Sequence, residues 1–390
     1  MNGSLAIDVL VVLLVVAAAV GGWRSGLFRS VVGALGLIAG GIAAYLLLPQ
    51  VSAWVPAPEW RVAAIIAAGV ALLALGTAVG ALLGRLLQRG ARAVKLSMID
   101  RGAGLLVSGV AAALALSTVA GGLSALGAPV LSQAVGGSLT LGAIDRVTPD
   151  PVKSFLASVR NTAVGDALPW LIDTLAPPAT LPPAADVDAS SPALEKAAAS
   201  VVRVSGVAYR CGTGLTGSGF VVADDRVVTN AHVVAGVEQP VVETPGESPH
   251  QASVVYFDAA TDLAVLQVPG LDAAPLRLGA PLDPGAGAAV QGYPFGGPFV
   301  SGAATVAEVT NIARADGSGS RQVYTLSAEV NKGNSGGPLL ETDGSVAGVV
   351  FAKSAVADHI GYALTDKELA PVVSAAPGLS ASVSSGQCAA

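Results

Sequence analysis

Four apolar stretches in the first third of this 390-residue chain limit its fold more than any other feature. They cover residues 5–20, 27–48, 62–84 and 103–126. A membrane-spanning helix needs about 20 apolar residues, so the last three fit and the first is slightly short. A cleaved signal peptide would explain only the first stretch, and no Lys or Arg precedes that stretch. The sequence therefore predicts a four-helix transmembrane bundle over residues 1–127.

The charges of the connecting loops predict how this bundle is oriented. The first loop carries Arg24 and Arg29, the second has no basic excess, and the third carries five basic residues between positions 85 and 101. Basic loops stay on the cytoplasmic side of a membrane. We therefore expect the N-terminus and everything after residue 127 to lie outside the cytoplasm, on the periplasmic side of the cell membrane.

Small residues recur at spacings of four in the second and third stretches. Gly36 and Gly40 lie in the second, whereas Gly76, Gly80 and Gly84 lie in the third. Such spacing places the glycines on one helix face, which lets two helices approach closely. We interpret these glycines as packing residues. A transport role is the alternative, and the near absence of ionisable residues within the spans argues against it.

The turn Gly333-Asn334-Ser335-Gly336-Gly337 is the strongest chemical signal in the chain. Glycine lets consecutive backbone N–H groups point into one small space, which can hold the oxyanion of an acyl-transfer transition state. A serine beside that space is placed to act as the nucleophile. The same residue types also form ordinary hairpin loops, so the turn alone does not establish catalysis.

Two further segments supply the groups that a serine nucleophile needs. His232 ends a β-rich apolar run, and Asp262 begins another. A serine hydroxyl needs a base within hydrogen-bond reach, and that base needs a partner that fixes its tautomer. His232, Asp262 and Ser335 fill these roles in the chain order of chymotrypsin-type double β-barrels. The reaction needs no metal or organic cofactor, and the dispersed histidines and cysteines predict no metal site.

Over about residues 194–375 the chain resembles trypsin-like proteases of the bacterial HtrA branch. The segments that carry the resemblance are residues 217–221, 229–232, 262–265 and 333–338. It implies an all-β chymotrypsin-like fold with the active site between two barrels, and the regular spacing of short β-branched runs agrees. It also implies that the backbone N–H groups of Gly333 and Ser335 form the oxyanion hole. A protein that keeps this fold without activity is the alternative.

Residues near the Ser335 turn also resemble those that form the substrate pocket of trypsin-like enzymes. Glu329 lies six residues before Ser335, where trypsin-like enzymes of basic specificity carry an acid. HtrA proteins usually have an aliphatic residue there, and a solvent-facing glutamate neutralised by Lys332 is the alternative interpretation. Three residues match the strand that pairs with substrate backbone, namely Phe351, Ala352 and Lys353.

The segment between the bundle and the protease, residues 128–193, indicates an amphipathic and proline-rich linker. Its prolines at 177–186 favour an extended spacer. Cys211 and Cys388 both fall in the part expected outside the cytoplasm, where a cysteine pair predicts a disulfide. Two free thiols are the alternative. The disulfide would tie the tail, residues 376–390, to the first barrel, and this tail is too short for the PDZ domain that HtrA proteins usually carry.

The start near Asp8, the loop at residues 24–29 and the glycine-rich second stretch resemble the CvpA (colicin V production) membrane family over about residues 5–165. With a protease attached, the chain resembles actinobacterial membrane serine proteases associated with acid and oxidative stress resistance. That resemblance implies an endopeptidase that cleaves envelope proteins.

A membrane-anchored scaffold or sensor that binds peptides without cutting them is the alternative from another functional class. The expected partners are the lipid bilayer and extracytoplasmic proteins. The net charge of −6 and the lack of a basic run argue against nucleic acid. The sequence predicts no particular oligomeric state.

Overall fold

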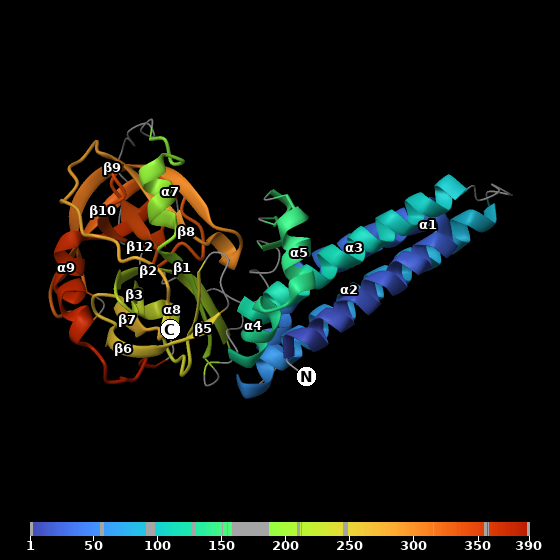
Figure 1. Cartoon of the computed structure of the whole chain (residues 1–390), viewed down its shortest axis with the longest axis horizontal. Coiled ribbons are helices and arrows are strands. Elements are labelled where there is room, and N and C mark those ends of the chain that lie inside the picture. The colour runs from blue at the N-terminus through green and yellow to red at the C-terminus, as the bar shows by residue number, and fades with distance from the viewer. Residues whose placement is uncertain are drawn as a thin grey trace. The chain divides into compact units, whose positions relative to one another are not determined.

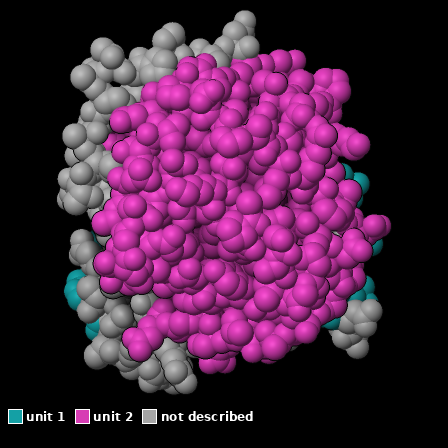
Figure 2. All heavy atoms as spheres, turned by 90° about the vertical axis from the view of Figure 1, so that its left-hand side faces the viewer, with its two compact units in different colours: residues 1–124, 133–165 teal, residues 125–132, 166–390 magenta. Residues whose placement is uncertain are grey.

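The chain divides into two compact units in its computed structural model. Unit 1 comprises residues 1–124 and 133–165, and unit 2 comprises residues 125–132 and 166–390 (Figure 1). Figure 1 labels the helices and strands, and Figure 2 colours unit 1 teal and unit 2 magenta. The structure describes residues 3–54, 58–90, 98–125, 129–149, 151–153, 155–157, 187–208, 211, 213–244, 249–314, 316–354, 357 and 359–387.

The N-terminal part of the chain is helical. The long helices are α1 (Gly3–Trp54), α2 (Pro58–Gly90) and α3 (Met98–Ala125), followed by the short helices α4 (Pro129–Gly136) and α5 (Leu139–Val147). Within the described residues, three helices are long and apolar enough to cross a membrane, over Gly3–Ala44, Ala67–Leu86 and Met98–Gly121. The structure thus bears out an N-terminal set of apolar helices but does not confirm the predicted number of four.

The first apolar helix is interrupted at the predicted first loop. Its 42 residues would extend about 63 Å if straight, roughly twice the thickness of a bilayer core. The backbone leaves helical geometry at Gly26, with φ 78° and ψ 170°. That region of conformation is open essentially to glycine alone. The break separates two segments that were expected as individual spans.

Glycines bring the apolar helices into backbone contact, as their spacing predicts. A Cβ atom at Gly36 of α1 would clash with the carbonyl oxygen of Gly76 in α2 and would lie 2.9 Å from Gly80 Cα. A Cβ atom at Gly22, before the break, would likewise clash with the carbonyl oxygen of Gly104 in α3. Small residues therefore occur where two helix backbones meet.

Unit 2 contains a seven-stranded antiparallel sheet with the order β5-β4-β1-β2-β3-β7-β6. Alternate valines and leucines of these strands build one apolar core, which includes Val204, Val227 and Leu266. The strands are β1 (Val201–Ala208), β2 (Thr213–Ala223), β3 (Arg226–Thr229), β4 (Val241–Glu243), β5 (His250–Gln251), β6 (Ser253–Asp258) and β7 (Leu263–Gln267).

The remaining strands form a closed barrel with the order β10-β13-β12-β11-β8-β9. They are β8 (Gly287–Gly292), β9 (Val300–Ala313), β10 (Ser320–Ala328), β11 (Pro338–Leu340), β12 (Val346–Lys353) and β13 (Ile360–Thr365). A second core joins residues of both sheets, including Phe220 of β2 and Phe351 of β12. Short helices flank the strands: α7 (Pro192–Ala198), α8 (Ala231–Val234), η2 (Pro294–Gly296), α9 (Asp366–Ala375) and η3 (Ala376–Gly378).

Three predictions concern residues that lie partly or wholly outside the described part of the chain. These are the amphipathic segment at residues 150–160, the proline-rich spacer at residues 177–186, and Cys388 with the end of the tail. The linker and the disulfide pairing therefore stay predictions.

The glycine contact between α1 and α2 can be tested by adding one methyl group. We expect Gly36→Ala to lower the free energy of unfolding by about 1–3 kcal/mol through overpacking. Gly33→Ala is the matched control on the same helix, because a Cβ atom there meets nothing within 4 Å. The measurement is thermal unfolding of the full chain in detergent micelles by far-UV circular dichroism. Equal melting temperatures for both variants would contradict the contact.

Candidate active site

His232 and Asp262 meet because two neighbouring strands place them side by side. β3 ends at Thr229, which pairs with Ala264 near the start of β7. His232 follows β3 in the short helix α8, and Asp262 directly precedes β7. The Nδ1 atom of His232 lies 3.0 Å and 2.9 Å from the two carboxylate oxygens of Asp262. The backbone N–H of His232 also donates to Asp262 Oδ1 at 3.0 Å.

Asp262 has an unusual backbone conformation that its neighbours stabilise. Its φ angle is 62°, in the left-handed region that non-glycine residues seldom adopt. The buried Asn230 donates from Nδ2 to the carbonyl oxygen of Asp262 at 2.9 Å. Asn230 also precedes helix α8. One amide side chain thus links the histidine helix to the aspartate turn.

Ser335 lies in the turn between β10 and β11, and its backbone is held against β2. The N–H of Ser218 donates to the carbonyl oxygen of Ser335 at 2.8 Å. A Cβ atom at Gly217 would lie 2.6 Å from Val233 Cγ2 and 2.9 Å from Ser335 O. The same point on β2 therefore contacts both the turn of Ser335 and the residue that follows His232. The structure brings the three sequence-predicted residues into one region.

The hydroxyl of Ser335 does not donate to His232 in this structure. It donates to the carbonyl oxygen of Phe351 at 3.3 Å. His232 Nε2 is buried and has no hydrogen-bond partner among the described residues. Catalytic hydrogen bonds are often loose in structures without substrate, so the missing contact does not exclude a catalytic pairing of these two side chains.

The turn around Ser335 has the conformation that its glycines predict. Gly333 has φ 93° and Gly336 has φ 85°. A Cβ atom at Gly336 would clash with the carbonyl oxygen of Ser218. No hydrogen bond from the N–H of Gly333 or Ser335 occurs among the described residues, which leaves both donors available for a ligand oxyanion.

Ser218 connects the sheet of His232 to the turn of Ser335, and sequence reasoning missed its role. Its side chain is fully buried. Its Oγ donates to the carbonyl oxygen of Gly333 at 2.6 Å and accepts from the N–H of Tyr293 at 2.9 Å. Its own carbonyl accepts from Thr229 Oγ1 at 2.7 Å. A serine between glycines, Gly217 and Gly219, was the only signal in the sequence.

The predicted pocket residues differ in their surroundings. Glu329 is exposed and accepts a hydrogen bond from Asn331 Nδ2 at 3.2 Å, so the structure does not place it on a buried pocket floor. Phe351 and Ala352 are buried and Lys353 is half-buried on β12. Burial and the neighbouring Lys353 ammonium lower the pKa of Lys332.

The described residues contain no group of three His, Cys, Asp or Glu side chains that could hold a metal ion. Cys211 packs beside a small apolar cluster of Ala208, Leu215 and Val237. The C-terminal tail reaches the same area, because the N–H of Gly236 donates to the carbonyl oxygen of Ser385 at 3.1 Å.

Two family profiles match separate parts of the chain. The profile of the trypsin-like peptidase domain matches residues 217–349, which lie in the β-rich part. The profile of the colicin V production protein matches residues 7–149, which contain the apolar helices. The chain therefore combines a helical domain of membrane type with a peptidase domain.

Individual relatives match all or part of the chain. The serine protease Rv3671c of Mycobacterium tuberculosis is 33% identical over 405 aligned positions, which cover 100% of both chains. The crystal structure of the Rv3671c protease in its active form superposes with a TM-score of 0.51 at 38% identity, covering 55% of this chain and 99% of that one. The putative serine protease HhoB of Synechocystis is 35% identical over 38% of this chain and 37% of its own length. The chain thus belongs to the family of Rv3671c, as a trypsin-like serine endopeptidase that follows a colicin V production-type domain of apolar helices.

Proposed function

We propose that the chain is a membrane-anchored endopeptidase that cleaves extracytoplasmic proteins through His232, Asp262 and Ser335. The observation that carries the proposal is the contact of His232 Nδ1 with both carboxylate oxygens of Asp262. This contact fixes the tautomer that leaves Nε2 as the base. Nε2 has no hydrogen-bond partner among the described residues, so it is available to accept the proton of a nucleophile.

The proposed reaction is acyl-enzyme hydrolysis. Ser335 Oγ attacks a peptide carbonyl carbon while its proton passes to His232 Nε2. The N–H groups of Gly333 and Ser335 hold the negative charge on the former carbonyl oxygen. His232 then gives its proton to the departing amine, which breaks the peptide bond. Water repeats the sequence on the acyl group and restores Ser335.

The resting position of Ser335 requires one local change before attack. Its hydroxyl must exchange the carbonyl oxygen of Phe351 for His232 Nε2. We propose that rotation about the Cα–Cβ bond of the serine makes this exchange. We propose that a substrate strand paired along Phe351, Ala352 and Lys353 of β12 favours the reactive position.

We further propose that the helices cross the membrane four times, with the N-terminus and the protease outside the cytoplasm. The break at Gly26 supports four crossings, because it divides a 42-residue apolar helix into two segments of about span length. The basic residues of the first and third loops support the orientation. The proposed domains are then the bundle, the linker, the protease and the tail, with the boundaries given by the sequence.

A disulfide between Cys211 and Cys388 belongs to this proposal. The tail follows the first sheet, since the N–H of Val383 donates to the carbonyl oxygen of Val254 at 2.8 Å and Ser385 binds Gly236. Cys211 packs against Val237, next to Gly236. The pairing suits an oxidising compartment outside the cytoplasm. A role in acid or oxidative stress resistance rests on the resemblance to actinobacterial membrane proteases.

Replacement of the nucleophile tests the enzyme directly. We expect Ser335→Ala to lower kcat by about 10⁶-fold, while the free energy of unfolding changes by less than about 1 kcal/mol because one long hydrogen bond is lost. The measurement is hydrolysis of casein by the purified full chain in detergent micelles. Equal hydrolysis by both proteins would contradict the assignment. Peptide binding by a wild type that hydrolyses nothing would favour the scaffold instead.

Ser218→Ala tests whether the hydroxyl of Ser218 holds the oxyanion turn. We expect kcat to fall by about 10- to 100-fold with little change in KM. The hydroxyl of Ser218 holds the turn that carries the oxyanion donors and does not contact the oxyanion itself. The matched control is Ser200→Ala, which removes a buried hydroxyl that donates to the carbonyl oxygen of Ala274, also at 2.6 Å. The control should lose about 1 kcal/mol of stability and keep its kcat. Equal kcat values for the two variants would refute the role of Ser218.

A further inference from the structure

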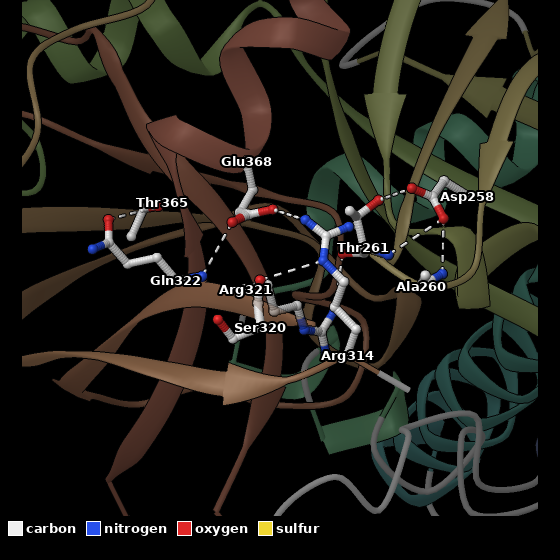
Figure 3. Close-up of polar contacts among 9 residues, drawn as sticks. All are labelled: Asp258, Ala260, Thr261, Arg314, Ser320, Arg321, Gln322, Thr365 and Glu368. Atoms are coloured by element: carbon white, nitrogen blue, oxygen red, sulfur yellow. Dashed lines mark hydrogen bonds and ion pairs between the residues drawn. The ribbon is translucent and has the colours of Figure 1, made fainter. Parts of the chain in front are cut away.

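A buried arginine, Arg321, lies between the closed barrel and the turn that carries Asp262. It belongs to β10, and its side chain is 1% exposed. Its Nη1 atom donates to the carbonyl oxygen of Thr261 at 2.9 Å. Thr261 directly precedes Asp262, and Figure 3 shows Arg321 together with this turn. A residue of one sheet thus binds the peptide group next to the aspartate of the other.

The same guanidinium group contacts the residue that accepts the hydroxyl of Ser335. Its central carbon lies 4.7 Å from the centre of the Phe351 ring, within the range of a cation–π interaction. The carbonyl oxygen of Phe351 accepts the hydrogen bond from Ser335 Oγ. Arg321 therefore touches the immediate surroundings of both Asp262 and Ser335.

The hydrogen bonds of Arg321 do not explain why a charged side chain occupies this buried position. Two nitrogens of Arg321, Nε and Nη2, are buried without a hydrogen-bond partner among the described residues. A buried charge with few hydrogen bonds is costly, and apolar replacements of such groups are often neutral or stabilising. A function that needs the cation would explain why an arginine occupies a core position.

The charges around Arg321 indicate what it stabilises. Those that affect it are Asp262 and Asp258 from the β6–β7 turn, Glu368 from α9, and the repelling Arg314. Burial lowers the pKa of Arg321, and Asp262 is the largest effect opposing that shift. Glu368 already forms an ion pair with Arg314 at 2.9 Å. Glu368 is therefore already paired, whereas Arg321 binds the turn that carries Asp262 through the carbonyl oxygen of Thr261.

The turn itself shows why an external support is needed. Asp262 has φ 62°, which costs free energy in a non-glycine residue. Asp258 holds the start of the turn by accepting from Thr261 Oγ1 at 2.6 Å and from the N–H of Ala260 at 2.9 Å. Asn230 holds the carbonyl oxygen of Asp262. Arg321 binds the peptide group between these two anchors.

We propose that Arg321 is a positioning residue for the catalytic triad, which fixes the Asp262 turn from the opposite sheet. The inference rests on the proposed function, because it assigns Asp262 its role beside His232. The alternative is a purely structural role, in which Arg321 only ties the two sheets together. A structural role affects stability, whereas a positioning role affects the rate at each assembled site.

Arg321→Met separates these roles, because methionine keeps the apolar stem and removes the charge and the hydrogen bond. We expect kcat for each active site to fall by about 10- to 100-fold, as for a misplaced catalytic group, with KM changed by less than about threefold. We expect the melting temperature to stay equal or rise. Arg321→Lys keeps the charge and should give a kcat above that of Arg321→Met.

The experiment uses the full chain in detergent micelles, with active sites counted by a fluorophosphonate probe. Arg314→Met is the control, because Arg314 is the neighbouring cation in Figure 3 and pairs with Glu368. We expect the control to keep its kcat. A wild-type kcat for Arg321→Met together with a lower melting temperature would overturn the inference. If Ser335→Ala kept activity, the proposed function would fail, and the role of Arg321 would fail with it.

Discussion

His232 and Asp262 belong to the seven-stranded sheet and Ser335 belongs to the closed barrel, so a triad of these residues requires the two sheets to stay fixed against each other. Ser218 meets this requirement from β2, because its N–H and Oγ bind the carbonyl oxygens of Ser335 and Gly333. Arg321 meets it from β10 by binding the turn of Asp262. Buried polar contacts therefore set the geometry that an apolar core alone leaves unspecified.

Glycine has two different uses in the two units. In the helices, Gly36 and Gly76 remove side chains so that two backbones can touch. In the nucleophile turn, Gly333 and Gly336 supply positive φ angles, and the lack of a Cβ at Gly336 admits the carbonyl oxygen of Ser218. The first use depends on spacing along a helix, and the second depends on a single turn. The same residue type thus serves close packing in one unit and a tight turn in the other.

The sequence predicted the elements whose signals are local. Strands such as β1, β3 and β7 correspond to the short β-branched runs whose regular spacing predicts an all-β fold. The short strands β4, β5 and β11 were not predicted, because two or three residues carry little periodicity. The longer elements β13 and α9 were not predicted either. His232, Asp262 and Ser335 were expected from chemistry and order. Ser218 and Arg321 were not, since their roles exist only across the two sheets. The break at Gly26 coincides with an expected loop, although the described residues contain three long apolar helices.

The most direct test of this account is labelling of the full chain with a fluorophosphonate probe, followed by mass spectrometry of the adduct. The probe reacts with a serine only when a base and an oxyanion site are assembled around it. We predict one adduct on Ser335 in the wild type and none after His232→Ala. An unlabelled Ser335 in the folded wild type, or equal labelling after His232→Ala, would contradict a triad built from these two sheets.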